Sequence, residues 1–325
     1  MHRRHVLTLA AAFAIPCAAH AQRRTVRIGF LGGISPDPDT QKVALVPFRE
    51  ALRELGHVEG QNLTIDFRWA EGDPTRLPGL AAELLKLDVD VLVTMGPRPA
   101  MVAKAATTTV PILAAAVDNP VQMGLIADFS RPGANITGIS GYGGELVAKR
   151  LQLLKELVPS TRRVAVLMNP ATLARQGLQE SVAALAPRVG LAVQIVEAAA
   201  PEQFEAAFDA IARERAEGVL VLADATFWIH RARLHELVAK RRLPSVWGGR
   251  GYLEGGGLAS YQSDFPTMFR RAAAMVDALL KGARPATMPF EQATKLELVI
   301  NLRSARALGI TVPPALLVAA DELIE

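Results

Sequence analysis

Short apolar runs that stop at glycine or proline alternate with longer helical segments along this chain. Residues 26–31 form such a run and stop at Gly32, as a buried strand that leads into a loop does. A helical segment then reaches Leu55 and ends at Gly56, in the position of a C-terminal capping glycine. Residues 63–69 alternate apolar and polar side chains, which predicts a strand with one face toward solvent.

The same alternation continues and then restarts after a glycine-rich passage at residues 133–144. Further strands are expected at residues 89–95, 110–117, 164–168, 192–196, 219–223 and 244–247, with helices between them. Parallel strands need long crossover connections, and these are usually helices. The pattern therefore predicts an α/β protein of two Rossmann-like lobes, each a parallel sheet covered by helices on both faces.

The first 21 residues have a different pattern, which is typical of a cleavable export signal. Arg3 and Arg4 form a basic start, residues 6–15 are apolar, and residues 19–21 are a small-residue cleavage site. Ten apolar residues are too few to span a bilayer as a helix. We expect export to the periplasm by the general route or, given the arginine pair, the twin-arginine route. A buried N-terminal helix is the alternative.

Composition narrows the class of protein. The chain has 325 residues, a net charge of +4 and one cysteine, Cys17, which lies within the expected signal. A single cysteine excludes a disulfide scaffold and a cysteine-rich metal site. The basic residues are scattered, and their one run, residues 240–242, falls where a helix should end and where cations favourably meet the helix dipole. We therefore expect no nucleic-acid partner.

Motifs of catalysis are missing from the expected loops. The first strand is not followed by G-x-G-x-x-G, and no P-loop lysine is present. Residues 138–142 place Tyr142 where a serine hydrolase has its final glycine. His230 and His235 are five residues apart and point away from each other on a helix, so we expect surface or helix-end roles for both. These absences favour binding over catalysis, with no cofactor and no metal.

Ligands of open parallel sheets bind beside the carboxyl ends of the strands. Gly96, Pro97 and Arg98 lie at such an end and precede a helix, whose free N–H groups and positive dipole suit an anion. A simple chain turn is the alternative there. Asp224 follows a buried strand and could receive an ammonium group, or it could cap the next helix. Together these residues suggest a zwitterion held between the two lobes.

Other polar and aromatic residues occupy the same expected edge. The full set of expected ligand-binding residues is Ser35, Gly96, Pro97, Arg98, Asp118, Asn119, Asn169, Asp224, Thr226, Trp247, Tyr261 and Asp264.

Several stretches of this sequence resemble one known family. They are residues 54–62 (ELGHVEGQN), 69–72 (WAEG), 88–94 (DVDVLVT), 131–138 (RPGANITG), 294–302 (TKLELVINL) and 307–314 (ALGITVPP). Together they resemble the tryptophan/tyrosine-type family of ABC transporter substrate-binding proteins, and the resemblance extends from Val26 to Glu325.

The resemblance implies a type I periplasmic-binding fold, with two α/β lobes, three crossing segments and a ligand cleft between the lobes. It assigns residues 25–138 and 258–283 to lobe 1, and residues 139–257 and 288–325 to lobe 2. It also implies a monomer that closes on a small ligand and delivers it to a membrane permease driven by a separate ATPase.

Three departures from the family pattern bear on the ligand. Residues 95–98 read Met-Gly-Pro-Arg where similar sequences often read Ser-Gly-Thr-Pro, and residues 118–120 read Asp-Asn-Pro in place of Asp-Pro. Leu296 stands where phenylalanine is common. The exchange of a hydroxyl for a guanidinium favours a ligand with a stronger anionic group. A sensor module that feeds a membrane receptor and an exported α/β enzyme are the open alternatives.

Overall fold

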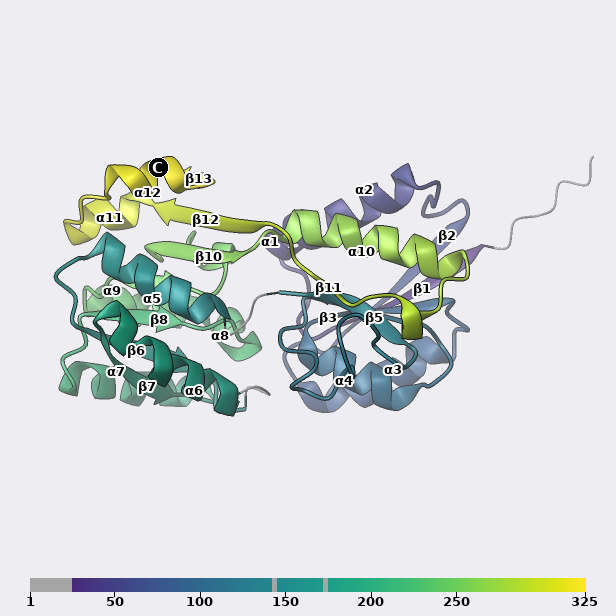
Figure 1. Ribbon diagram of the computed structural model, residues 1–325, viewed down its shortest axis with the longest axis horizontal. Coiled ribbons are helices and arrows are strands. Elements are labelled where there is room, and N and C mark those ends of the chain that lie inside the picture. The colour runs from purple at the N-terminus through teal and green to yellow at the C-terminus, as the bar shows by residue number, and fades with distance from the viewer. Residues whose placement is uncertain (1–24, 142–144, 172–174) are drawn as a thin grey trace, which may run out of the picture.

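The protein consists of two α/β lobes that lie side by side (Figure 1). The computed structural model describes residues 25–141, 145–171 and 175–325. Each lobe has one sheet, with six strands in lobe 1 and seven in lobe 2. The expected pair of α/β lobes with parallel sheets is therefore confirmed.

The sheet of lobe 1 is parallel throughout, in the order β11-β5-β4-β3-β1-β2. Its strands are β1 (Val26–Gly32), β2 (Leu63–Trp69), β3 (Val91–Met95), β4 (Ile112–Ala115), β5 (Ile136–Ser140) and β11 (Glu291–Gln292). Ile28 of β1 pairs with Ile65 on one side and Val91 on the other. The central strands are buried on both faces, which explains why they are continuous apolar runs in the sequence.

Helices cover both faces of this sheet. They are α1 (Pro38–Thr40), α2 (Val46–Glu54), α3 (Leu77–Leu85), α4 (Pro97–Ala106) and α10 (Phe265–Leu280), and a π-helical turn, Gln41–Leu45, joins α1 to α2. Phe48 of α2 and Phe269 of α10 pack in one core cluster with Phe30 of β1. Leu77 of α3 packs in the cluster on the opposite face, with Leu31.

The sheet of lobe 2 has the order β13-β12-β10-β9-β8-β6-β7, and only the pair of β10 and β12 is antiparallel. Its strands are β6 (Arg163–Met168), β7 (Ala192–Glu197), β8 (Gly218–Val221), β9 (Ser245–Trp247), β10 (Ala259–Ser263), β12 (Leu296–Asn301) and β13 (Glu322–Ile324). Its helices are α5 (Glu145–Leu157), α6 (Arg175–Leu185), α7 (Phe204–Arg213), α8 (Ala225–Ile229), α9 (Arg231–Lys240), α11 (Leu302–Leu308) and α12 (Pro314–Ala319). Helices α5 and α12 pack on one face, and α7 and α9 pack on the other.

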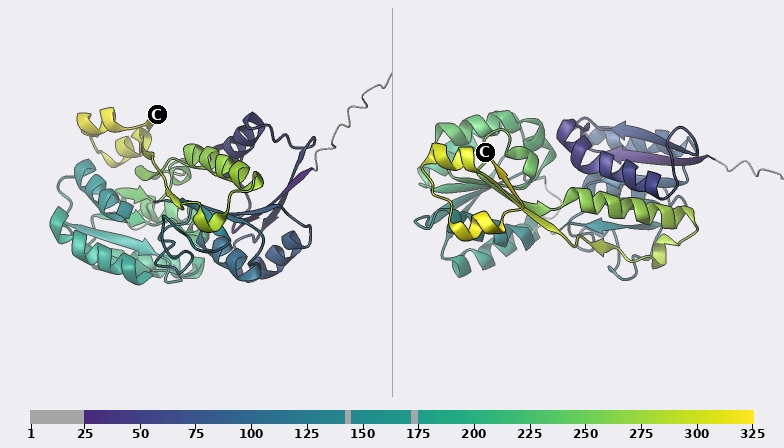
Figure 2. Two further views of the ribbon diagram at one scale, coloured as in Figure 1. Left: turned by 45° about the vertical axis from the view of Figure 1, so that its right-hand side comes forward. Right: turned by 90° about the horizontal axis from the view of Figure 1, so that it is seen from above.

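The chain passes between the two sheets three times. It crosses between β5 and α5, between β10 and α10, and between β11 and β12 (Figure 2). We call the residues at the second and third crossings, Ser263–Asp264 and residues 293–295, together with Gly141 at the first, the hinge.

The strand pairing corrects the lobe boundaries that the resemblance implies. β10 pairs with β9 and β12 in lobe 2, although residues 258–283 are assigned to lobe 1. Residues 139–140 and the strand β11 pair within lobe 1, although they fall in the ranges assigned to lobe 2. A strand belongs to the sheet whose strands it bonds, and this pairing is not visible in the sequence pattern.

The expected export signal, residues 1–21, lies outside the described residues. Among the residues that the structure does describe, no helix combines the length and the apolar character needed to cross a membrane.

Candidate functional site

Loops at the carboxyl ends of the strands meet between the two lobes. Arg98 at the start of α4 donates from Nη2 to the carbonyl oxygen of Ala171 after β6, at 2.6 Å. Arg231 of α9 forms an ion pair with Asp37, which caps α1, at 3.1 Å. A Cβ atom on Gly72 would lie 2.3 Å from Cδ1 of Ile229. We call these three the cross-lobe contacts, and the surface on which they lie the interlobe face.

The expected anion site at α4 lies on the interlobe face. Gly96 caps the helix with φ of 90°, a conformation that suits glycine, and Pro97 is the first helical residue. Arg98 is exposed, and its guanidinium reaches across to lobe 2. One of its donors is therefore already used on a main-chain carbonyl.

The loop after β4 carries backbone strain. Ala116 and Asn119 have φ of 55° and 52°, and such left-handed conformations are costly for residues other than glycine. Asp118 lies between them, and its Oδ1 would be 2.5 Å from a Cβ atom on Gly141. The strained loop thus holds the Asp118 carboxylate against the first crossing.

Asn169, Asp224 and Thr226 come together at the ends of β6 and β8. Asp224 Oδ1 accepts hydrogen bonds from the Thr226 N–H at 2.8 Å and from Asn169 Nδ2 at 3.1 Å. The Phe227 N–H also points to the same oxygen, at 3.4 Å. Asp224 therefore caps α8, which is the second of the two roles expected for this residue from the sequence. The bond from Asn169 fixes the carboxylate at the interlobe face.

Ser35 joins two loops of lobe 1. Its hydroxyl donates to Glu71 Oε1 at 2.5 Å, so the loop after β1 is bound to the loop after β2. Glu71 was not among the expected residues. The signal that could have found it is its place two residues after the last residue of a predicted strand.

Three of the expected ligand-binding residues take no part in the cross-lobe contacts. Trp247 is fully buried in the core of lobe 2, and its indole N–H donates to Ser245 Oγ at 2.9 Å. Its ring lies between those of His235 and Tyr252, with centroids at 4.4 Å and 5.1 Å. Trp247 lies at the end of β9, as the sequence predicts, but its side chain points into the core of lobe 2.

Tyr261 lines a groove of about 570 Å³ on lobe 2, between α5, β12 and α12. Asp264 lies at the hinge, where it caps α10 by accepting from the Thr267 N–H at 2.8 Å and from Lys295 Nζ at 2.9 Å. Burial alone would raise the pKa of Asp264, but the hydrogen bonds from Lys295 and Thr267 lower it. These bonds hold the Asp264 carboxylate at the hinge.

The two histidines have different surroundings. His230 precedes α9 as its N-cap residue, which agrees with the expected helix-end role. His235 is buried, contrary to expectation, and neither ring nitrogen has a hydrogen-bond partner among the described residues. Burial, aided by the charge of Arg231, lowers the pKa of His235 to about 4. No group of three or more potential metal ligands is present in the described part of the chain.

The sequence analysis missed Arg150 of α5. This arginine is only 6% exposed, and it donates from Nε to the carbonyl oxygen of Tyr261 at 2.7 Å and from Nη2 to that of Gly248 at 3.4 Å. Burial lowers its pKa to about 10, against the opposite effect of Asp118. The signal for it was its helical spacing, because it falls on the buried stripe of Val147, Leu151 and Leu154.

The fold has two α/β lobes with mainly parallel sheets, three crossings between them and polar strand ends that meet at one interface. These features define the class of type I periplasmic-binding proteins. The chain belongs to the family of ABC transporter substrate binding proteins, whose sequence model matches residues 38–324.

Known relatives support this placement. The chain is 23% identical over 263 residues to the "Tyrosine-binding protein" of Clostridioides difficile (strain R20291), which covers 81% of this chain and 75% of that protein. It is 25% identical to a solved ABC domain from Streptococcus pneumonia in complex with L-Trp, with a TM-score of 0.85 and coverage of 92% and 100%. A conserved domain protein from Vibrio cholerae is 27% identical, with the same TM-score and coverage.

Proposed function

We propose that this protein is the extracytoplasmic ligand-binding component of an ABC importer and binds a small amino-acid-like or carboxylate ligand between its lobes. The observation that carries the proposal is the meeting of polar strand ends from both lobes, bridged by Arg98 with Ala171 and by Arg231 with Asp37. The tyrosine and tryptophan named for its relatives support an amino acid as the ligand.

The mechanism is closure about the hinge. A ligand that contacts both lobes favours the closed arrangement by its differential binding to that state. The closed form, acting as a monomer, then delivers the ligand to a membrane permease whose ATPase is a separate protein. Residues 1–21 direct export to the periplasm in this proposal. The protein releases its ligand unchanged and is not an enzyme.

A ligand screen tests this function. Thermal unfolding of the purified protein is followed in the presence of each L-amino acid, of aromatic acids and of small carboxylates. The dissociation constant of each stabilising compound is then measured by calorimetry. A ligand at 100 times its dissociation constant should stabilise the fold by about 2.7 kcal/mol. X-ray scattering should show a smaller radius of gyration with that ligand. Chemical conversion of the ligand, or no stabilisation by any compound, contradicts the proposal.

A further inference from the structure

Arg150 is a buried cation of lobe 2. Helix α5 begins on the side of lobe 2 that faces lobe 1 (Figure 1). The guanidinium has five N–H donors, and its hydrogen bonds to Tyr261 and Gly248 use two of them. The other donors have no hydrogen bond to any residue in the described ranges. A buried charge is costly without a partner, so the remaining donors of this guanidinium suit an anion.

An acidic group of the other lobe acts on this cation. The charge of Asp118 acts on Arg150, although it is outweighed by the effect of burial. A Cβ atom placed on Gly141 would lie 2.5 Å from Asp118 Oδ1 and 3.5 Å from Ser263 Oγ. These two oxygens therefore lie close together. The hydroxyl of Ser263 is buried and has no hydrogen-bond partner within the described residues. A cation, an anion and an unpaired hydroxyl therefore gather beside the hinge.

Such a set matches the head group of an α-amino acid. A carboxylate can accept two parallel hydrogen bonds from a guanidinium, and it would satisfy open donors of Arg150. An ammonium would be attracted to the carboxylate of Asp118. By contrast, Arg98 is exposed and already donates to the carbonyl oxygen of Ala171.

We propose that Arg150 binds the carboxylate of the ligand and Asp118 binds its ammonium group, so that the head group is held between the lobes at the hinge. This inference rests on the proposed function as an amino-acid-binding protein. It replaces the pairing of Arg98 with Asp224 that the sequence suggests. It also explains how a ligand couples to closure, because its two charges contact different lobes.

The test compares amino acids with their amines. L-Tyrosine and L-tryptophan are titrated by calorimetry into wild type and Arg150→Gln, alongside tyramine and tryptamine, which lack the carboxylate. Loss of hydrogen bonds between charged groups should weaken amino-acid binding about 30-fold in the variant. Amine binding should change less than about 3-fold, so the preference for the amino acid is lost. In Asp118→Asn, the preference over the deaminated acids 3-(4-hydroxyphenyl)propionate and indole-3-propionate should be lost instead.

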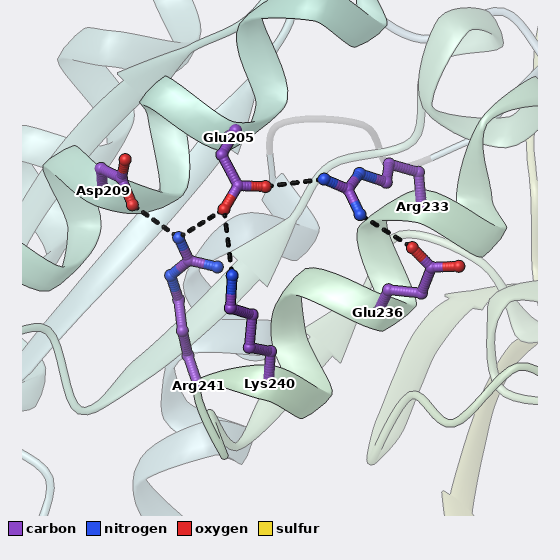
Figure 3. Close-up of polar contacts among 6 residues, drawn as sticks. All are labelled: Glu205, Asp209, Arg233, Glu236, Lys240 and Arg241. Atoms are coloured by element: carbon purple, nitrogen blue, oxygen red, sulfur yellow. Dashed lines mark hydrogen bonds and ion pairs between the residues drawn. The ribbon is translucent and has the colours of Figure 1, made fainter.

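Two further variants separate binding from folding. Arg241→Gln removes another mostly buried arginine of lobe 2, whose bonds to Glu205 and Asp209 stay within that lobe (Figure 3). It should leave the preference for amino acid over amine unchanged. Arg150→Lys keeps the charge and loses the forked geometry, and it should weaken amino-acid binding about tenfold if the glutamine variant does not fold.

The outcomes are distinct. If Arg150→Gln folds and keeps the preference, or loses amino acid and amine alike, the inference is wrong and the proposed function stands. If wild type binds carboxylates but no amino acid, this inference is wrong and the proposed function stands. If it binds neither, both are wrong.

Discussion

The hinge and the cross-lobe contacts connect the same two lobes in different ways. At the hinge, the side chain of Asp264 is 10% exposed and is bound by Lys295 and by the backbone of Thr267. In the cross-lobe contacts, the side chains of Arg231 and Asp37 are 34% and 20% exposed. The partner of Asp264, Lys295, is 55% exposed. The hinge thus combines covalent continuity with one buried carboxylate, whereas both side chains of the cross-lobe ion pair are partly solvated.

This difference bears on how closure is controlled. Exposed ion pairs contribute between zero and about 1 kcal/mol, so water can replace them at little cost. Buried hydrogen-bonded charges are costly to break. In the proposed mechanism, the hinge therefore keeps its geometry in both states, and the cross-lobe contacts adjust the population of the closed one.

The largest expected effect concerns pH and the core beneath the cross-lobe contacts. His235 follows Arg231 by one helical turn, and its pKa is lowered from 6.5 to about 4, mainly by burial. Between these pH values the unfolded chain takes up a proton that the folded protein does not. The free energy of unfolding should therefore fall by about 3 kcal/mol as pH decreases from 7 to 4, at 1.36 kcal/mol per unit of pKa shift.

Urea unfolding at several pH values measures this effect. His235→Leu removes the titrating group, and its free energy of unfolding should depend much less on pH across the same window. The pKa of Asp264 at the hinge is lowered, so its contribution is present above the ordinary range of an aspartate and is lost only at more acid pH. An unchanged pH dependence in His235→Leu would show that another group is responsible.

The second prediction tests the hinge itself. Asp264→Ala should lower the free energy of unfolding by about 2 kcal/mol, because it removes a helix cap and a charged hydrogen bond from Lys295. Denaturant unfolding measures the loss. Asp73→Ala is the matched control, since Asp73 also caps a turn, Pro74–Arg76, but at an exposed site away from the hinge. An equal loss in both variants would contradict a special role for the hinge.

The third prediction tests a cross-lobe contact. Asp37→Asn removes the charge that pairs with Arg231, while asparagine can still cap α1 through its side-chain oxygen. Ligand affinity should fall about threefold, as expected for an exposed ion pair, with little change in stability. The effect should shrink at high salt, since screening weakens the pair in wild type. An effect that does not depend on salt would rule out the ion pair as the cause.

The smallest effect is expected in a network that belongs to neither region. Glu205 lies in an ion-pair network with Arg233, Lys240 and Arg241 within lobe 2 (Figure 3). Hydrogen bonding from Arg241 lowers the pKa of Glu205 more than burial raises it. Glu205→Gln should leave ligand affinity unchanged in calorimetry, because no member of the network takes part in a cross-lobe contact. A changed affinity would mean that this surface is coupled to closure.

The sequence predicted the elements better than the site. Buried parallel strands are continuous apolar runs, so most strands and the two lobes could be located directly. The loops with Arg98, Asn169 and Asp224 were also correctly placed at strand ends. Which sheet receives β10 depends on pairing between distant residues, and no local pattern shows it.

Side-chain direction was harder to predict than position. Trp247 and Tyr261 lie on strands at the expected edge, yet one points into the core and the other into a surface groove. Arg150 was overlooked because a charged residue on an amphipathic helix is normally assigned to the exposed face, whereas this one shares the buried stripe.

The interleaved path of the chain also determines when the protein can fold during synthesis. Lobe 1 needs α10 to cover its sheet and β11 to complete it, and lobe 2 needs β12 and β13. A growing chain therefore contains neither lobe in full until residue 292 has been added. Domains usually fold as units while the chain emerges, but here both lobes are finished only near its end. Late completion suits export by the general route, since a chain that is threaded unfolded through a membrane must not fold first.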